Sequence, residues 1–139
     1  MIERKILEKY LEIPYKHMGR DESGIDCWGL ILMFYKDVYR VKLWDIEESY
    51  DIDWSFKNKN HFIENYHKEW IISGTPKKFD VVLFKTKGKI VNHGGIYLGE
   101  GKFLHASKAS IGITRFSENK NYWKKNIENF YRLRILCHD

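Results

Sequence analysis

The sequence predicts an α+β fold in which N-terminal helices pack on an antiparallel sheet of five to six strands. Apolar residues spaced three and four apart fill the first half of the chain, and short runs rich in β-branched residues follow Pro76. A short glycine turn between two of these runs favours antiparallel pairing, because a parallel crossover needs about a dozen residues. Helices that precede strands in this way are typical of the α+β class.

Three helices are expected in the first half. Arg4 to Leu11 forms a short helix that ends near Pro14, since the residue before a proline avoids helical geometry. Trp28 to Tyr39 carries one broad apolar face. Asn60 to Ile72 places three aromatic residues at intervals of four. The aromatic, acidic segment from Trp44 to Phe56 follows no clear pattern and is left without an assignment.

Five strands are expected in the second half, because each segment is short, apolar and bounded by turn residues. They are Val81 to Phe84, Ile90 to Leu98, Phe103 to Ala106, Ile111 to Phe116 and Phe130 to Leu136.

Length and composition favour one globular domain over residues 1–139, because 139 residues match the usual size of a single core and 43% of them are hydrophobic. No apolar run approaches the ~18–20 residues of a membrane span. The start of the chain lacks the apolar stretch of a secretory signal, so we expect the protein to be made in the cytoplasm without one. The net charge is +5, but the basic residues are scattered, which argues against a nucleic-acid partner.

Cys27 stands where a turn-rich segment meets the predicted helix from Trp28 to Tyr39. Backbone N–H groups and the helix dipole at such a position favour a reactive thiolate. The alternative is a buried structural thiol, which is the interpretation given to Cys137 near the C-terminus. Two cysteines this far apart, in a chain without an export signal, do not indicate a disulfide framework.

Two histidines, His93 and His105, lie in consecutive predicted strands joined at Gly99-Glu100-Gly101. If these three residues form the loop, with Gly101 left-handed, Gly95 pairs with His105. The two histidine side chains then share one face as diagonal neighbours, with Cβ atoms at most ~7–8 Å apart. A base for a cysteine nucleophile needs a partner that fixes its tautomer, and this pair supplies one.

A metal site is the main chemical alternative for these residues. Cys27, His93 and His105 are suitable zinc ligands by type, but the sequence lacks the closely spaced ligand pair that marks zinc sites. We therefore expect no metal and no cofactor. His17, in the loop before Cys27, is placed to line a cleft.

These segments together resemble the NlpC-type cysteine peptidases, papain-like cell-wall endopeptidases of bacteria and their phages. The resemblance rests on Tyr15 and on the blocks Gly-Ile-Asp-Cys-Trp-Gly-Leu around Cys27, His-Gly-Gly-Ile-Tyr-Leu-Gly from His93, and Phe-Leu-His-Ala around His105. It implies a papain-like fold, with Cys27 as nucleophile, His93 as general base, His105 as the orienting third member and Tyr15 as a hydroxyl donor at the acyl oxygen.

The resemblance also implies a substrate, namely a D-γ-glutamyl link to a diamino acid in peptidoglycan stem peptides. Four residues are expected to bind it: Asp26 and Trp28 on either side of the nucleophile, Gly94 after the base, and His17 in the loop before Cys27.

Departures from the common family pattern point to one branch. Trp28 follows the nucleophile where most members have Ser, and Gly94 follows the base where Val is usual. With Phe130-Tyr131-Arg132, these features look more like the phage tail-tip branch. That branch would imply tail-tip partner proteins and a place in the virion tail, with action at the host cell wall. A non-catalytic tail-assembly module, and an interbacterial toxin or acyl-transfer enzyme on the same scaffold, are the alternatives.

Overall fold

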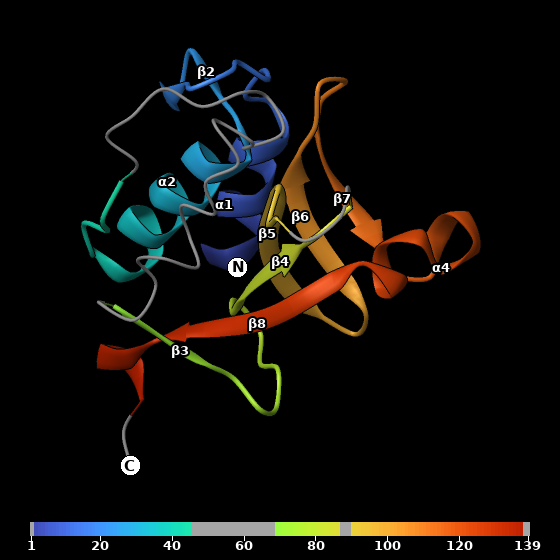
Figure 1. Cartoon of the computed structure of the whole chain (residues 1–139). Coiled ribbons are helices and arrows are strands. Elements are labelled where there is room, and N and C mark those ends of the chain that lie inside the picture. Colours follow the sequence, from blue (N-terminus) through green and yellow to red (C-terminus); the bar gives the residue numbers. More distant parts are fainter. Residues whose placement is uncertain (1, 46–68, 87–89, 138–139) are drawn as a thin grey trace.

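The computed structural model describes residues 2–45, 69–86 and 90–137, in which helices and a six-stranded sheet form separate layers. Helices α1 (Ile2–Leu11) and α2 (Cys27–Tyr39) lie together on one side of the sheet, and α4 (Glu118–Lys125) lies on the other (Figure 1). No helix among the described residues is both long enough and apolar enough to cross a membrane.

The first turn of α2 is fixed by Asp26 and Gly29. Asp26 is the N-cap, and its side chain accepts a hydrogen bond from the backbone N–H of Gly29 at 2.8 Å. A Cβ on Gly29 would lie 2.2 Å from the carbonyl oxygen of Gly19, so only glycine lets the helix approach that backbone so closely. This contact sets α2 against the small hairpin of β1 (Arg20–Asp21) and β2 (Gly24–Ile25) and thereby places Cys27.

The main sheet is antiparallel and has the strand order β3-β8-β4-β5-β6-β7. Its strands are β3 (Trp70–Ile72), β4 (Val81–Phe84), β5 (His93–Gly99), β6 (Lys102–Ala106), β7 (Ile111–Arg115) and β8 (Ile127–Leu133). The predicted α+β class and the antiparallel sheet of five to six strands are confirmed.

The hairpin between β5 and β6 keeps the predicted register but reaches it by another route. Ile96 pairs with Leu104 and Tyr97 with Phe103, as the predicted pairing requires. At the turn, however, Gly99 pairs with Lys102 across only two residues, and the register shifts between Tyr97 and Gly99. This irregularity restores the parity that a two-residue loop alone would have reversed, so His93 and His105 share a face.

Apolar side chains form two clusters, one on each side of the sheet. The larger packs α1 and α2 against the sheet, with Leu30, Ile31 and Phe34 of α2 fully buried. The smaller contains Val82, Phe84 and Phe103, covered by aromatic residues that include Trp123 of α4. Both faces of the central strands are therefore buried.

Several predicted boundaries differ from the structure. Trp70–Ile72 was expected to end a helix that begins at Asn60 but forms strand β3, paired with β8; residues 60–68 and most of the 44–56 segment lie outside the described residues. The last strand begins at Ile127 rather than Phe130 and ends at Leu133, where a single 3-10 turn follows. Cys137, expected as a buried thiol at a strand end, comes after this turn and is exposed. Strand β5 begins at His93 rather than Ile90.

Candidate active site

Cys27 is the first residue of α2, and its side chain faces a small cavity of about 200 Å³. The residue is only 5% exposed. Tyr15, His93 and Trp123 line the same cavity, so the structure brings the predicted nucleophile, base and tyrosine together. The remaining lining residues are Thr86, Asn92, Ala106, Ser107 and Lys108.

His93 and His105 form a direct ring-to-ring hydrogen bond. Nε2 of His93 lies 2.7 Å from Nδ1 of His105, and the two ring planes are nearly perpendicular at 89°. A Cβ on Gly95 would lie 3.1 Å from the Cβ of His105 and 2.5 Å from the carbonyl oxygen of Leu104, so glycine at this position lets β5 approach β6 closely. The two histidines therefore share a face as predicted, and their bond uses Nε2 of His93 rather than Nδ1.

Aromatic rings surround the histidine pair on the α4 side of the sheet. Trp123 lies 5.1 Å from His93 and 5.1 Å from His105, measured between ring centroids. Phe84 packs on His93 and Phe103 on His105. Burial and the neighbouring His105 lower the pKa of His93 to about 3. Burial lowers the pKa of His105 to about 4, against an opposing effect of the Glu118 charge. Both imidazoles are therefore neutral near pH 7.

Burial of the Cys27 thiol opposes the thiolate that the helix start was expected to favour. Burial raises its pKa well above the ordinary value, and the charge of Asp26 acts in the same direction. The backbone N–H groups of Gly94, Cys27 and Trp28 do lower the pKa, as a helix start should, but burial outweighs them. Cys27 and His93 line the same cavity, and burial disfavours the charged form of both side chains.

Tyr15 reaches the cavity from the chain segment before β1. An isolated bridge pairs Tyr15 with Ile25, which holds the tyrosine beside the start of α2. Burial is the main influence that raises the pKa of Tyr15 to about 12, with smaller contributions from Cys27 and Asp26. The hydroxyl thus stays protonated and is able to donate a hydrogen bond.

Asp26 and Trp28, two of the expected substrate-binding residues, are packed behind the nucleophile. Asp26 accepts hydrogen bonds from the backbone N–H of Met18 at 2.9 Å and from Arg20 at 3.1 Å, in addition to its capping bond. Trp28 is 1% exposed, and its indole N–H donates to Asp45 at 2.9 Å. The structure therefore gives both side chains positioning roles in the scaffold around Cys27.

His17 and Gly94, the other two expected substrate-binding residues, are placed differently. His17 is half-buried and is not among the residues that line the Cys27 cavity. Gly94 presents its backbone N–H to the sulfur of Cys27, where it favours the thiolate. Gly94 therefore affects the Cys27 thiol through its backbone.

Trp123, Lys108 and the pair Thr86–Asn92 contribute to the cavity but carry no motif that would single them out in the sequence. Asn92 donates to the Thr86 hydroxyl at 2.6 Å and accepts from the Thr86 backbone N–H at 3.0 Å, which ties the start of β5 to the end of β4. Only the fold brings these residues to the nucleophile.

Metal ligands are not grouped in the described part of the chain: no three His, Cys, Asp or Glu side chains there are arranged to hold an ion. The imidazoles of His93 and His105 instead bond to each other, which occupies one nitrogen of each ring.

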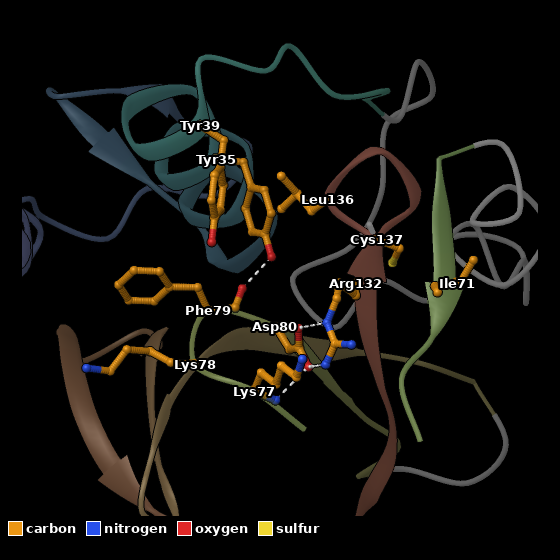
Figure 2. A pocket seen from close by; sticks show the side chains of 10 residues that line it. All are labelled: Tyr35, Tyr39, Ile71, Lys77, Lys78, Phe79, Asp80, Arg132, Leu136 and Cys137. Carbon is orange, nitrogen blue, oxygen red and sulfur yellow. Dashed lines mark hydrogen bonds and ion pairs between the residues drawn. The ribbon is translucent and has the colours of Figure 1, made fainter. Parts of the chain in front are cut away.

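A larger cavity of about 640 Å³ shares no lining residue with the Cys27 cavity (Figure 2). Across it, Arg132 binds Asp80 through two hydrogen bonds of 2.9 and 2.8 Å, and the Tyr35 hydroxyl donates to the carbonyl oxygen of Phe79. Arg132 also donates to Ser73 at 2.7 Å. The Arg132 contacts join β8 to the segment between β3 and β4, and the Tyr35 contact joins α2 to the same segment, so these contacts have a structural role.

The fold and the site together define a class. A cysteine at a helix N-terminus, a histidine on the adjoining strand and a second polar residue that orients it are typical of papain-like cysteine peptidases. The NlpC/P60 family model matches residues 12–132, and the chain belongs to this family.

Among curated relatives, the chain is 27% identical over 135 residues to the murein DD-endopeptidase MepS/murein LD-carboxypeptidase of Escherichia coli K12, covering 95% of this chain and 63% of that protein. It is 30% identical over 128 residues to the gamma-DL-glutamyl hydrolase of Bacillus subtilis, covering 90% of this chain and 27% of that protein. The chain thus spans less than two thirds of the length of both relatives.

Solved structures share the fold. An NLP/P60-family lipoprotein-like protein of Staphylococcus aureus Mu50 is similar with a TM-score of 0.66 and 24% identity, over 99% of this chain and 41% of that one. The fold predicted from the resemblance is thereby confirmed.

Proposed function

We propose that this protein is a cysteine peptidase that hydrolyses amide bonds in the stem peptides of peptidoglycan, at the D-γ-glutamyl link to a diamino acid. The observation that carries the proposal is the 2.7 Å bond from His93 Nε2 to His105 Nδ1 beside the cavity of Cys27. It fixes one nitrogen of His93 and leaves the other to act as a base.

Acylation begins from the neutral pair of thiol and imidazole. Nδ1 of His93 takes the Cys27 proton as the sulfur attacks the scissile carbonyl carbon. The resulting imidazolium then gives this proton to the leaving amine as the C–N bond breaks, and a thioester remains on Cys27. His105 accepts from Nε2–H of His93 throughout, which stabilises the charged ring.

Deacylation repeats these steps with water in place of the thiol. His93 takes a proton from water, the hydroxide attacks the thioester, and the proton returns to the sulfur as the acid product leaves. Tyr15 and the N–H groups at the start of α2 are the donors for the developing oxyanion, since the Tyr15 hydroxyl remains protonated.

A carboxylate-bearing peptide is the substrate class that the cavity favours. Lys108 lies on its rim, and the chain carries a net charge of +5. The names of two relatives support a stem-peptide substrate: MepS is a murein endopeptidase, and the Bacillus subtilis relative is a gamma-DL-glutamyl hydrolase.

We also propose a setting for this activity, namely a phage tail in which tail-tip proteins deliver the enzyme to the host wall. Trp28 after the nucleophile and the Phe130-Tyr131-Arg132 run support this part of the proposal. Copurification with tail proteins from virions tests it, and absence of the chain from purified virions would refute it.

The bond that is cleaved is tested with defined stem peptides and mass spectrometry. We expect products with a new amine on the diamino acid and a free γ-carboxyl on D-glutamate. A cross-linked dimer that contains only a D-alanyl link serves as the control substrate and should stay intact. Cleavage of the control alone would replace the γ-glutamyl assignment with a DD-endopeptidase activity, and no product from either substrate would refute the hydrolase.

A further inference from the structure

The second ring nitrogen of His105 has its own partner. Nε2 of His105 lies 2.9 Å from the hydroxyl oxygen of Thr114, on the next strand. His105 pairs with Gly112, so Thr114 stands two residues along β7 on the same face of the sheet. His93, His105 and Thr114 therefore form one line of hydrogen bonds across β5, β6 and β7.

The direction of these bonds decides whether His93 is able to act as a base. A neutral imidazole carries one proton, so it donates from one nitrogen and accepts at the other. If Nδ1 of His93 is to take a proton from the thiol, its Nε2 must carry the hydrogen and donate to Nδ1 of His105. His105 must then carry its own proton on Nε2, which points at Thr114.

The opposite direction forms the same number of hydrogen bonds but leaves His93 unable to act as a base towards Cys27. If the Thr114 hydroxyl donated to Nε2 of His105, the proton of His105 would lie on Nδ1 and point at His93. His93 would then carry its proton on Nδ1, the nitrogen needed by Cys27. The rings packed around the pair supply no competing acceptor, since an indole N–H only donates.

We propose that Thr114 is a positioning residue that accepts the Nε2–H of His105 and so selects the tautomer of both histidines that leaves Nδ1 of His93 free for Cys27. The direction assigned to these bonds and the effect on rate both rest on the proposed function, whereas the tautomers themselves are measured without turnover. The productive direction is also the one that survives when His93 becomes an imidazolium, because that ion donates from both nitrogens.

The tautomers are read by nitrogen NMR of the histidine rings in the resting protein near pH 7. The wild type should carry the His105 proton on Nε2. Thr114→Val has nearly the same shape without the hydroxyl, and it should give a mixture of tautomers. Thr114→Ser restores the acceptor and should restore the single form. A wild-type His105 protonated on Nδ1 would overturn the proposal, whether or not the enzyme is active.

Turnover gives the second readout. Thr114→Val should lower kcat by roughly three- to tenfold, the rate equivalent of one neutral hydrogen bond, with KM unchanged. Thr114→Ser should remain close to wild type, and so should Ile113→Val, a neighbouring change at a partly exposed position of β7. Unchanged kcat in Thr114→Val, together with an unchanged tautomer, would reduce Thr114 to a packing residue. An inactive wild type with the expected tautomer would refute the hydrolase and leave the assignment of Thr114 intact.

Discussion

Two opposing influences act on the Cys27 sulfur. The N–H groups of Gly94, Cys27 and Trp28 stabilise a thiolate, whereas burial and the Asp26 carboxylate disfavour it. Burial also keeps His93 and His105 neutral. In the proposed reaction the thiol and its base both start uncharged, so charge develops only when substrate is attacked, where the N–H groups, Tyr15 and His105 would stabilise it.

The resting thiol is therefore expected to give no thiolate signal at neutral pH. We predict that the Cys137→Ser variant, in which Cys27 is the only thiol, shows no ultraviolet thiolate absorbance up to about pH 8, because burial raises the pKa of Cys27. The variant that lacks both cysteines supplies the baseline. A thiolate that titrates below pH 7 would mean that an ion pair with His93 already exists before substrate binds.

At the residue scale, spacing predicted the histidine pair but not its surroundings. Residue parity along two strands was enough to bring His93 and His105 together, because side chains alternate between the faces of a strand. The roles of Asp26 and Trp28 were not visible, since their partners Arg20 and Asp45 are set by tertiary packing. The net shift in the pKa of the Cys27 thiol depends on burial, which no local sequence motif encodes.

At the scale of elements, α4 has the clearest effect on the site. Three residues at its start, Asn119, Lys120 and Asn121, have positive φ angles of 52–62°, a conformation uncommon outside glycine. The helical turn that follows places Trp123 over the histidines, between Phe84 and Phe103. Trp123 is thus the side chain that separates the pair from water on this side.

Replacing Trp123 should change the pKa of the histidines more than replacing a neighbouring residue of α4 would. We predict that Trp123→Ala destabilises the protein by about 2–3 kcal/mol and raises the pKa of His93 towards 6.5, because water reaches the ring. Proton NMR titration of the imidazoles measures the shift. Tyr122→Ala is the matched control, since Tyr122 is 39% exposed and packs on Trp123. An unchanged pKa of His93 in Trp123→Ala would show that Trp123 does not cover the pair.

Sequence predicted the type of an element where the apolar pattern was strong. The prediction failed where pairing with another strand overrode the local pattern. The segment from Trp28 to Tyr39 has helical spacing and forms α2 with nearly the predicted bounds. Trp70 fits a helical spacing as well, but Trp70–Ile72 pairs with β8 instead, because Trp70 is buried in that arrangement at 2% exposure. The start of α4 has no apolar period. Asn119, Lys120 and Asn121 there adopt left-handed geometry, which asparagine tolerates but lysine does not favour.

At the scale of the whole molecule, the site lies where the two apolar clusters meet. Cys27 belongs to the cluster on the side of α1 and α2, and Trp123 to the cluster on the side of α4. The chemistry therefore depends on both sides of the sheet being packed. It also means that folding places the buried His105 and the partly buried His93 where the charged imidazole is disfavoured.

This burial predicts that stability falls in acid. The pKa of each imidazole is lower in the folded protein than its ordinary 6.5, so the unfolded chain binds more protons once the pH drops below about 6.5. We expect a loss of order 1–2 kcal/mol per imidazole by about pH 5, and no loss from this source above neutrality. Denaturant unfolding at about pH 5 and just above neutral pH measures this loss of unfolding free energy. In the double variant His93→Gln with His105→Gln, the free energy of unfolding should depend less on pH. An equally steep pH dependence would contradict the burial of neutral imidazoles.

Turnover of a defined stem peptide by a matched pair of cysteine variants tests the central claim most directly. Cys27→Ala removes the sulfur at the start of α2, whereas Cys137→Ala removes the exposed thiol near the C-terminus. With both variants shown to be folded by their unfolding transitions, we predict that Cys27→Ala falls to the uncatalysed rate and that Cys137→Ala keeps the wild-type kcat. Appreciable turnover by Cys27→Ala, or its loss in Cys137→Ala alone, would contradict a catalytic centre built on Cys27, His93 and His105.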